Sequence, residues 1–250
     1  MLRTSEIPWL RILAEGTAIV VSILLAFAID AWWQERTEAD QERAQLEALL
    51  AEFVSAREHL QRQACWLEDS LGGTLGLLAQ MGPEAEPDPE QAGAALGRSL
   101  NIGIGAPEHS TLQDLLASRG RTDFGTQALW SSLQAWPTML ADLETDGRNL
   151  ERSREEDFVG AVVRLGVPLL ALIEGRPQSP GTPEELALPR SSFEANWSVL
   201  LRDPGVETVF AMRALRMQLL LSSHSAALDH LDTIVEALGG EPNQSGEPAC

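Results

Sequence analysis

The chain has 250 residues, which is enough for one large domain or two small ones with a buried core. It carries 37 Asp and Glu against 18 Lys and Arg, a net charge of −19. A surface this acidic argues against nucleic acid as a partner, because nucleic-acid binding needs basic groups to neutralise phosphates. The two cysteines are too few for a disulfide framework or a four-cysteine zinc site.

The two cysteines, Cys65 and Cys250, leave the redox compartment open. A single bridge between them is compatible with a location outside the cytoplasm, where thiols oxidise. Cys250 ends a polar tail, residues 239–250, whose composition predicts disorder. Cys65 lies beside an apolar helical stripe, where an unpaired Cys behaves as a small hydrophobic residue. We therefore expect two free thiols, with the bridge as the alternative.

The first predicted element is an apolar helix from Leu10 to Trp33. Between Leu10 and Ile29 only Arg11 and Glu15 are charged. As a helix, a stretch of about 20 residues rises about 30 Å, which is the thickness of the hydrocarbon core of a bilayer. The sequence therefore predicts a transmembrane helix with the lipid bilayer as its partner.

Tryptophans flank this stretch, with Trp9 before it and Trp32 and Trp33 after it. Indole rings favour the headgroup level at both faces of a membrane. We predict that these three side chains are membrane interface anchors.

A cleaved signal peptide is the chief alternative, because Ala26-Phe27-Ala28 matches an A-x-A cleavage site. Glu15 at the start of the apolar stretch and the Trp pair just beyond the supposed cut favour an uncleaved anchor. A buried helix of a soluble protein is less favoured, because this stretch is apolar on all sides while the later helices are amphipathic.

Orientation depends on the charges beside the span. Two Arg precede it and two follow it at similar distance, namely Arg3 and Arg11 before, and Arg36 and Arg43 after. The short N-terminal flank also carries the α-amino charge, whereas Asp and Glu dominate the segment after the span. We expect the N-terminus in the cytoplasm and the bulk of the chain outside it.

The run from Glu15 to Trp32 resembles the opening of an uncharacterised bacterial family of small single-pass membrane proteins. In that family a Glu begins an aliphatic span with a small residue in the middle, and the span ends in Ile, Asn or Asp, one spacer and Trp. The matching residues are Glu15, Ser22, Ala26, Ile29, Asp30 and Trp32. The segment from Ser110 to Ser118 is similar to a second segment of the family. The resemblance implies a membrane anchor and a helical domain, without implying an activity. With the orientation above, we expect the bacterial inner membrane, with the bulk of the chain in the periplasm.

Small residues recur every four positions along the predicted span, at Ala14, Ala18, Ser22 and Ala26. Such a stripe lets two helix backbones approach closely in lipid, although chance can produce it in an Ala-rich chain. Ionisable groups lie near both ends of the span, and such groups often serve assembly. We predict a helix-helix contact with another copy or another membrane protein, formed by Glu15, Ala18, Ser22, Ala26 and Asp30.

For residues 34–238 we predict an all-α, antiparallel helical bundle with coiled-coil-like packing. We expect the helix of the span to continue into this bundle. Apolar residues recur at spacings of three and four from Leu46 to Leu78, and no segment shows sustained period-two alternation. The chain thus divides into a short cytoplasmic N-terminus, a transmembrane helix, a bundle domain and a tail, at residues 1–9, 10–33, 34–238 and 239–250.

Turn and cap residues predict where the later helices begin and end. Prolines mark a linker over residues 81–89, and a short helix enters through Ser110 or Thr111. A long helical region runs over residues 126–173, with Pro137 as its expected kink and Pro168 as a candidate bend or end. After a Pro-rich segment, Asp203-Pro204 predicts the start of a last helix that ends before Gly239-Gly240.

No pattern predicts a catalytic, cofactor or metal site. The four histidines do not form a His-x-x-x-His or Glu-x-x-His pair, and no Gly-x-Ser-x-Gly elbow occurs. We therefore expect a membrane-anchored helical interaction or sensing module without enzymatic activity. A membrane-bound enzyme of unrecognised type is the alternative.

Overall fold

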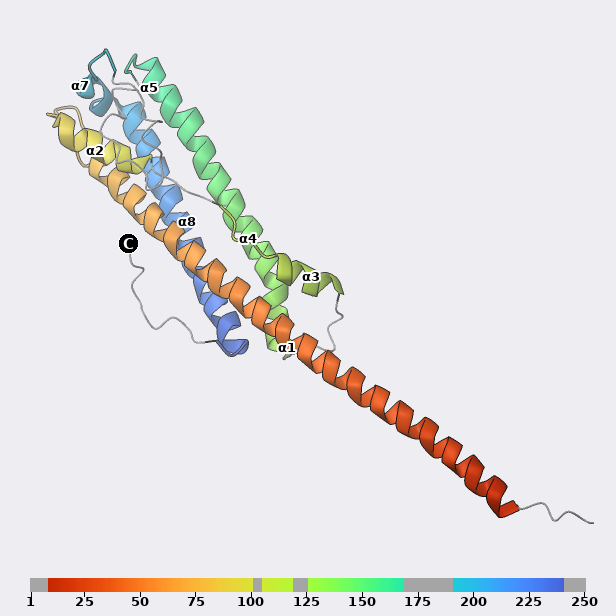
Figure 1. Cartoon of the computed structure of the whole chain (residues 1–250). Helices are drawn as coiled ribbons and strands as arrows, with labels where there is room; N and C mark the ends of the chain where they lie inside the picture. Colours follow the sequence, from red (N-terminus) through yellow and green to blue (C-terminus); the bar gives the residue numbers. More distant parts are fainter. Residues whose placement is uncertain (1–8, 101–104, 119–125, 169–190, 241–250) are drawn as a thin grey trace, which may run out of the picture. The chain divides into compact units, whose positions relative to one another are not determined.

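The computed structural model describes residues 9–100, 105–118, 126–168 and 191–240, and every element among them is a helix (Figure 1). The chain divides into two compact units, Met1–Leu49 and Leu50–Cys250. Helix α1 (Trp9–Leu78) is continuous and contributes residues to both units. For these residues the prediction of an all-helical fold is confirmed.

The first unit consists of the N-terminal part of α1. Large apolar side chains are exposed along it, namely Val20, Val21, Ile23, Leu24, Leu25, Phe27 and Ile29. Among the residues that the structure describes, no helix meets the length and apolarity of a membrane span. The predicted span begins at Leu10, and the side chains of residues 10–16, 18 and 19 lie outside that description. The span therefore stays a prediction.

The second unit is a helical bundle in which α8 (Pro204–Ala237) packs against α4 (Gln127–Ser153) and contacts α1 through several side-chain pairs. Arg57 of α1 pairs with Asp232 at 3.3 Å, and the Thr74 hydroxyl lies 3.8 Å from the sulfur of Met217. As α1 advances, its partners on α8 come from earlier positions, so the two helices are antiparallel.

The contacts with α8 also give the direction of α4 and of the π-helix η1 (Arg154–Val159), which follows α4 directly. The carbonyl oxygen of Ser132 lies 3.0 Å from Nε2 of His230, and Asp157 pairs with Arg216 at 3.3 Å. The segment from α4 through η1 is therefore antiparallel to α8. The antiparallel arrangement follows from these pairs, whereas coiled-coil-like packing stays a prediction.

Over residues 126–162 the recurring apolar residues form the buried face, whereas the apolar run predicted from Leu46 to Leu78 is only partly buried, with Leu46, Leu50, Leu71 and Leu78 half-buried. All eight apolar residues that recur over residues 126–162 are buried, namely Leu129, Leu133, Trp136, Leu140, Leu143, Leu150, Phe158 and Val162. In α8 the apolar seam is interrupted by two polar residues, Arg213 and His224, which are also buried. Other buried polar side chains are Gln63, Ser70, Thr74, Ser99 and Ser153.

The predicted limits of α8 are confirmed by local hydrogen bonds. The carboxylate of Asp203 accepts bonds from the N–H groups of Gly205 and Val206, at 2.8 and 3.0 Å. At the other end Gly239 adopts φ +86°, and the Gly240 N–H donates to the Val235 carbonyl at 2.9 Å. This is the Schellman arrangement that a glycine after the last turn favours.

The long helical region ends earlier than the sequence predicts. After η1, helix α5 (Gly160–Arg164) stops at Gly166, which has φ +66°. The Val167 N–H donates to the Val162 carbonyl, which closes a second Schellman turn. The predicted helix is therefore wrong for residues 165–168, where the chain turns. Residues 169–173 lie outside the described residues.

Three shorter helices complete the second unit: α2 (Pro89–Ser99), α3 (Ser110–Ser118) and α7 (Trp197–Leu201). Asp88 caps α2 through the N–H groups of Glu90 and Gln91, as Asp203 does for α8. Neither this cap nor α7 was predicted. Helix α3 lies where the sequence places it, but the Glu52 carboxylate of α1 accepts bonds from its first turn.

Candidate functional site

The predicted membrane anchors are exposed where the structure describes them. The rings of Trp32 and Trp33 lie 6.3 Å apart, edge to face, and the Arg36 guanidinium lies 5.8 Å from the Trp32 ring centroid. Arg36 thus places a cation over an indole that is 55% exposed. The side chain of Trp9 lies outside the described residues.

The predicted helix-helix contact is described in part. Ser22, Ala26 and Asp30 are exposed, and the Asp30 carboxylate accepts a hydrogen bond from the Gln34 amide at 3.4 Å. The side chains of Glu15 and Ala18 lie outside the described residues. The contact with a second helix stays a prediction.

Cys65 is disulfide-bonded, which corrects the expectation of a free thiol. Its position beside an apolar stripe is equally compatible with a free or an oxidised sulfur, so local sequence was not a sufficient guide. Cys250, the other cysteine of the chain, lies outside the described residues.

A buried polar cluster joins α1, α8 and the segment before α3. The Gln63 amide nitrogen donates to the Gly105 carbonyl and lies 2.9 Å from Nε2 of His59. Its carbonyl oxygen lies 3.2 Å from Nε2 of His224, and Nδ1 of His224 lies 2.9 Å from the Leu220 carbonyl. Gln63 thus contacts His59, one turn earlier on α1, and two groups distant in sequence, Gly105 and His224.

Burial lowers the pKa of His224 from its ordinary value of 6.5. The hydrogen bond to the Leu220 carbonyl acts in the opposite direction, and the nearby His59 acts in the same direction as burial. The ring is 1% exposed, so its neutral form is favoured in the folded protein at neutral pH.

Arg213 is a second buried polar group, and no carboxylate among the described residues forms an ion pair with it. Its Nε and Nη2 donate to the carbonyl of Ser99, the last residue of α2, at 3.2 and 2.6 Å. The Ser70 hydroxyl donates to the same oxygen at 2.8 Å. Burial, together with the charge of Arg154, lowers the pKa of Arg213 to about 10. At neutral pH it remains a cation beside the negative end of the α2 dipole.

One nitrogen of this guanidinium, Nη1, is buried and has no hydrogen-bond partner in the structure. The arrangement is that of a structural clamp on the end of α2.

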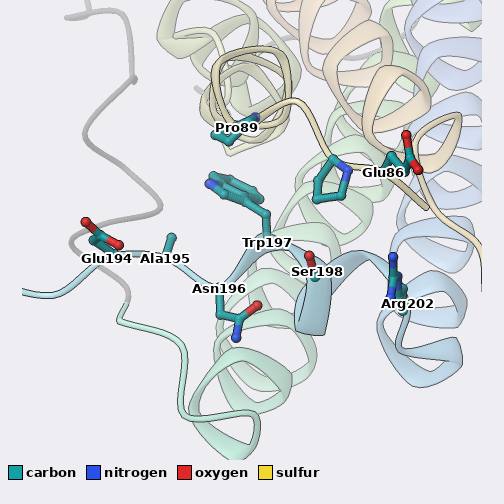
Figure 2. Close-up of a pocket in the computed structure, with 9 residues that line it drawn as sticks. Glu86, Pro89, Glu194, Ala195, Asn196, Trp197, Ser198 and Arg202 are labelled. Atoms are coloured by element: carbon teal, nitrogen blue, oxygen red, sulfur yellow. The ribbon is translucent and has the colours of Figure 1, made fainter. Parts of the chain in front are cut away.

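A pocket of about 620 Å³ lies between the turn before α2 and the residues that lead into α7 (Figure 2). Figure 2 shows the Trp197 ring pointing toward Pro89. Arg202 donates through Nε and Nη2 to the Ala85 carbonyl, at 3.1 and 2.8 Å. Glu86 and Glu194, both exposed, line the pocket. Because the Arg202 guanidinium is already bonded to the turn that contains Ala85, its contacts are structural.

The sequence did not predict that His59 and His224 would approach the same glutamine. One signal was available in the sequence. Gln63 and His224 each lie about one helical turn from buried apolar residues of their own helix, so both positions face the core. Among the described residues, no group of three His, Cys, Asp or Glu side chains is arranged to hold a metal ion.

No protein-family model matches the chain, and neither the curated proteins nor the solved structures include a similar one. The resemblance of residues 15–32 to a family of membrane proteins therefore stays a prediction.

Proposed function

We propose that residues 10–33 anchor this chain in a membrane, with the helical bundle outside the cytoplasm as an interaction or sensing module. The observation that supports it most is the exposed surface from Val20 to Ile29, where only Ser22 is polar and every described side chain is exposed. In water a surface of this kind is unfavourable by about 25 cal/mol per Å², whereas lipid removes that cost. The exposed Trp32 and Trp33 at its end suit the headgroup level.

The disulfide at Cys65 supports the orientation. Disulfides persist in oxidising compartments and are rare in the cytoplasm. Cys65 belongs to the second unit, which the proposal places outside the cytoplasm.

Two matched fusions after Leu238 test the topology in living cells. A reporter that is active only outside the cytoplasm should give a signal, and one that fluoresces only in the cytoplasm should stay dark. The chain should keep its full mass and stay in membranes washed at high pH. The opposite reporter pattern, or a soluble form beginning near Ile29, would contradict the proposal.

The role as an interaction module is tested by crosslinking in native membranes. The full chain is compared with a version in which an unrelated span replaces residues 10–33. A partner captured equally by both binds the bundle, as we propose. Loss of every specific partner in both preparations would contradict an interaction role.

A further inference from the structure

The disulfide at Cys65 has a single candidate partner within the chain. Cys65 is disulfide-bonded, and the sequence holds one other cysteine, Cys250. The second sulfur therefore belongs either to Cys250 of the same chain or to a cysteine of another molecule. The choice depends on whether the sulfur of Cys65 is accessible and on how far the C-terminal residues can reach.

Cys65 lies on an outer face of α1. Residues three, four and seven positions away share the face of a helix, and for Cys65 these are Arg62, Asp69 and Gly72. All three are exposed, and a Cβ added at Gly72 would meet nothing within 4 Å. A segment of chain can therefore reach the sulfur without displacing another helix.

Helix α8 ends beside α1, at a distance from Cys65 that the following residues can cover. A Cβ added at Gly240 would lie 2.8 Å from Cδ1 of Leu50, so the chain leaves α8 against Leu50. Cys65 lies fifteen residues after Leu50 on α1, which is a rise of about 22 Å. The ten residues 241–250 cover up to about 33 Å when extended. Cys250 of the same chain is therefore within reach of Cys65.

The order of the helices and the length of this tether favour a bond within one chain. Because α8 is antiparallel to α1, the chain must turn back after α8 to meet Cys65. Gly239, with φ +86°, ends the helix where that turn begins. A tether of about ten residues holds two groups at an effective concentration of the order of millimolar. A cysteine of a second molecule would need a similar concentration to compete.

We propose that Cys65 and Cys250 of one chain form a disulfide, a covalent staple that ties the end of α8 to the outer face of α1. In its formation, the Cys250 thiolate attacks the disulfide of an oxidant, either glutathione disulfide or a thiol–disulfide oxidoreductase. The Cys65 thiolate then attacks the Cys250 sulfur of the mixed disulfide and displaces the oxidant. Two thiols become one disulfide, while the oxidant takes up both electrons and both protons as two thiols. The staple goes beyond the proposed membrane anchor and does not depend on it.

Peptide mapping of the purified full chain identifies the partner of Cys65. The chain is reduced, reoxidised with glutathione disulfide, blocked with N-ethylmaleimide and digested with trypsin without reductant. Because trypsin cleaves after Arg, the two cysteines fall in fragments 63–98 and 217–250. We expect these fragments joined to each other, from a chain that runs as a monomer on a gel without reductant. Fragments that stay alkylated, that are joined to their own copies, or that are joined only at twice the mass of the chain would overturn the staple.

This result is distinguishable from a failure of the membrane anchor. Glutathione supplies the oxidant in solution, so the compartment in which the bundle lies does not affect the bond. The reporter fusions test the compartment separately.

Two variants of residues 242–248 test the reach of the C-terminal residues. Deleting these residues leaves three after Gly240, which cover about 10 Å and cannot cross about 22 Å along α1. The matched control replaces them with seven Gly and Ser residues, which keeps the length. Both variants retain α8 and its cap. The control should form the monomeric bond as the wild type does, and the deletion should not. A deletion variant that forms this bond would overturn the geometry.

Urea unfolding measures what the staple contributes to the fold. In the unfolded chain the bond closes a loop between residues 185 apart, whereas in the folded chain only the ten residues after Gly240 remain to be closed. Closing the longer loop costs more entropy. Reduction should therefore raise the unfolding constant of the wild type by roughly tenfold to a hundredfold and leave that of Cys250→Ser unchanged. An equal response of the two chains would overturn the staple.

Discussion

The carboxylate of Glu52 on α1 accepts a 2.7 Å hydrogen bond from the backbone N–H of Thr111, in the first turn of α3. Its other oxygen accepts the next N–H, that of Leu112, at 3.1 Å. One side chain therefore satisfies two of the unpaired donors that begin the helix, and its charge faces the positive end of the helix dipole. Helix α3 is attached to α1 by its cap.

Replacing this cap should weaken the fold. We expect Glu52→Ala to lower the free energy of unfolding by about 1 to 2 kcal/mol, because two N–H groups lose a charged partner. Urea unfolding of the full chain measures the loss, and hydrogen exchange should show it first at Thr111 and Leu112. Glu58→Ala is the control, since Glu58 is exposed and 4.0 Å from Arg62. An equal loss in both variants would argue against the cap.

Two adjacent glycines of α1 should respond in opposite directions to alanine. A Cβ at Gly73 would lie 2.7 Å from the Ala95 carbonyl oxygen and the Ser99 nitrogen, both backbone atoms of α2. A Cβ at Gly72 meets nothing within 4 Å. We expect Gly73→Ala to destabilise the chain by about 2 kcal/mol through overpacking, and Gly72→Ala to stabilise it by about 0.5 to 1 kcal/mol through helix propensity.

Thermal unfolding of the two alanine variants beside the wild type checks the pair. Tolerance of Gly73→Ala without loss would mean that α1 and α2 do not approach as closely as the structure has them.

Arg213 should matter more for its volume than for its charge. Arg213→Ala leaves a cavity beneath α2 and should cost about 3 kcal/mol. Arg213→Met keeps most of the volume, removes a buried cation and leaves Ser70 bonded to the Ser99 carbonyl. Its effect should stay within about 1 kcal/mol, because apolar replacement of a buried charge is often neutral.

Urea unfolding of both Arg213 variants separates the two roles. If Met and Ala cost the same, the clamp on the Ser99 carbonyl carries the stability, and the packing argument fails.

Larger side chains at Ser22 and Ala26 test the predicted helix-helix contact of the span. Replacing both Ser22 and Ala26 with Leu should preserve membrane insertion, because hydrophobicity rises, while the larger side chains keep two backbones apart. Self-association of the span, measured in membranes with a paired reporter, should fall at least several-fold. Val21→Leu and Leu25→Ile together provide a control of similar composition at neighbouring positions. An unchanged signal in the Ser22 and Ala26 variant would rule out self-association through this stripe.

Much of the helical framework was determined by the sequence alone, because its signals act between near neighbours. Apolar spacing located the buried face of α4, and Asp203 with Pro204 located the start of α8 within one turn. Gly239 marked its end for the same reason, since the capping bonds join residues three and five positions apart. The end of the 126–173 region was predicted too late, because the helix cap at Gly166 lies within a run of mostly apolar residues that resembles a continuing helix.

Only the tertiary structure decided which distant groups meet. The cap of α3 comes from Glu52, 59 residues earlier, and the partner of His224 lies 161 residues away on α1. A helix-period pattern predicts that a position is buried, but not which side chain faces it, because that depends on how the helices cross. Polar residues in an apolar seam, such as Gln63, Arg213 and His224, acquire their roles from those crossings.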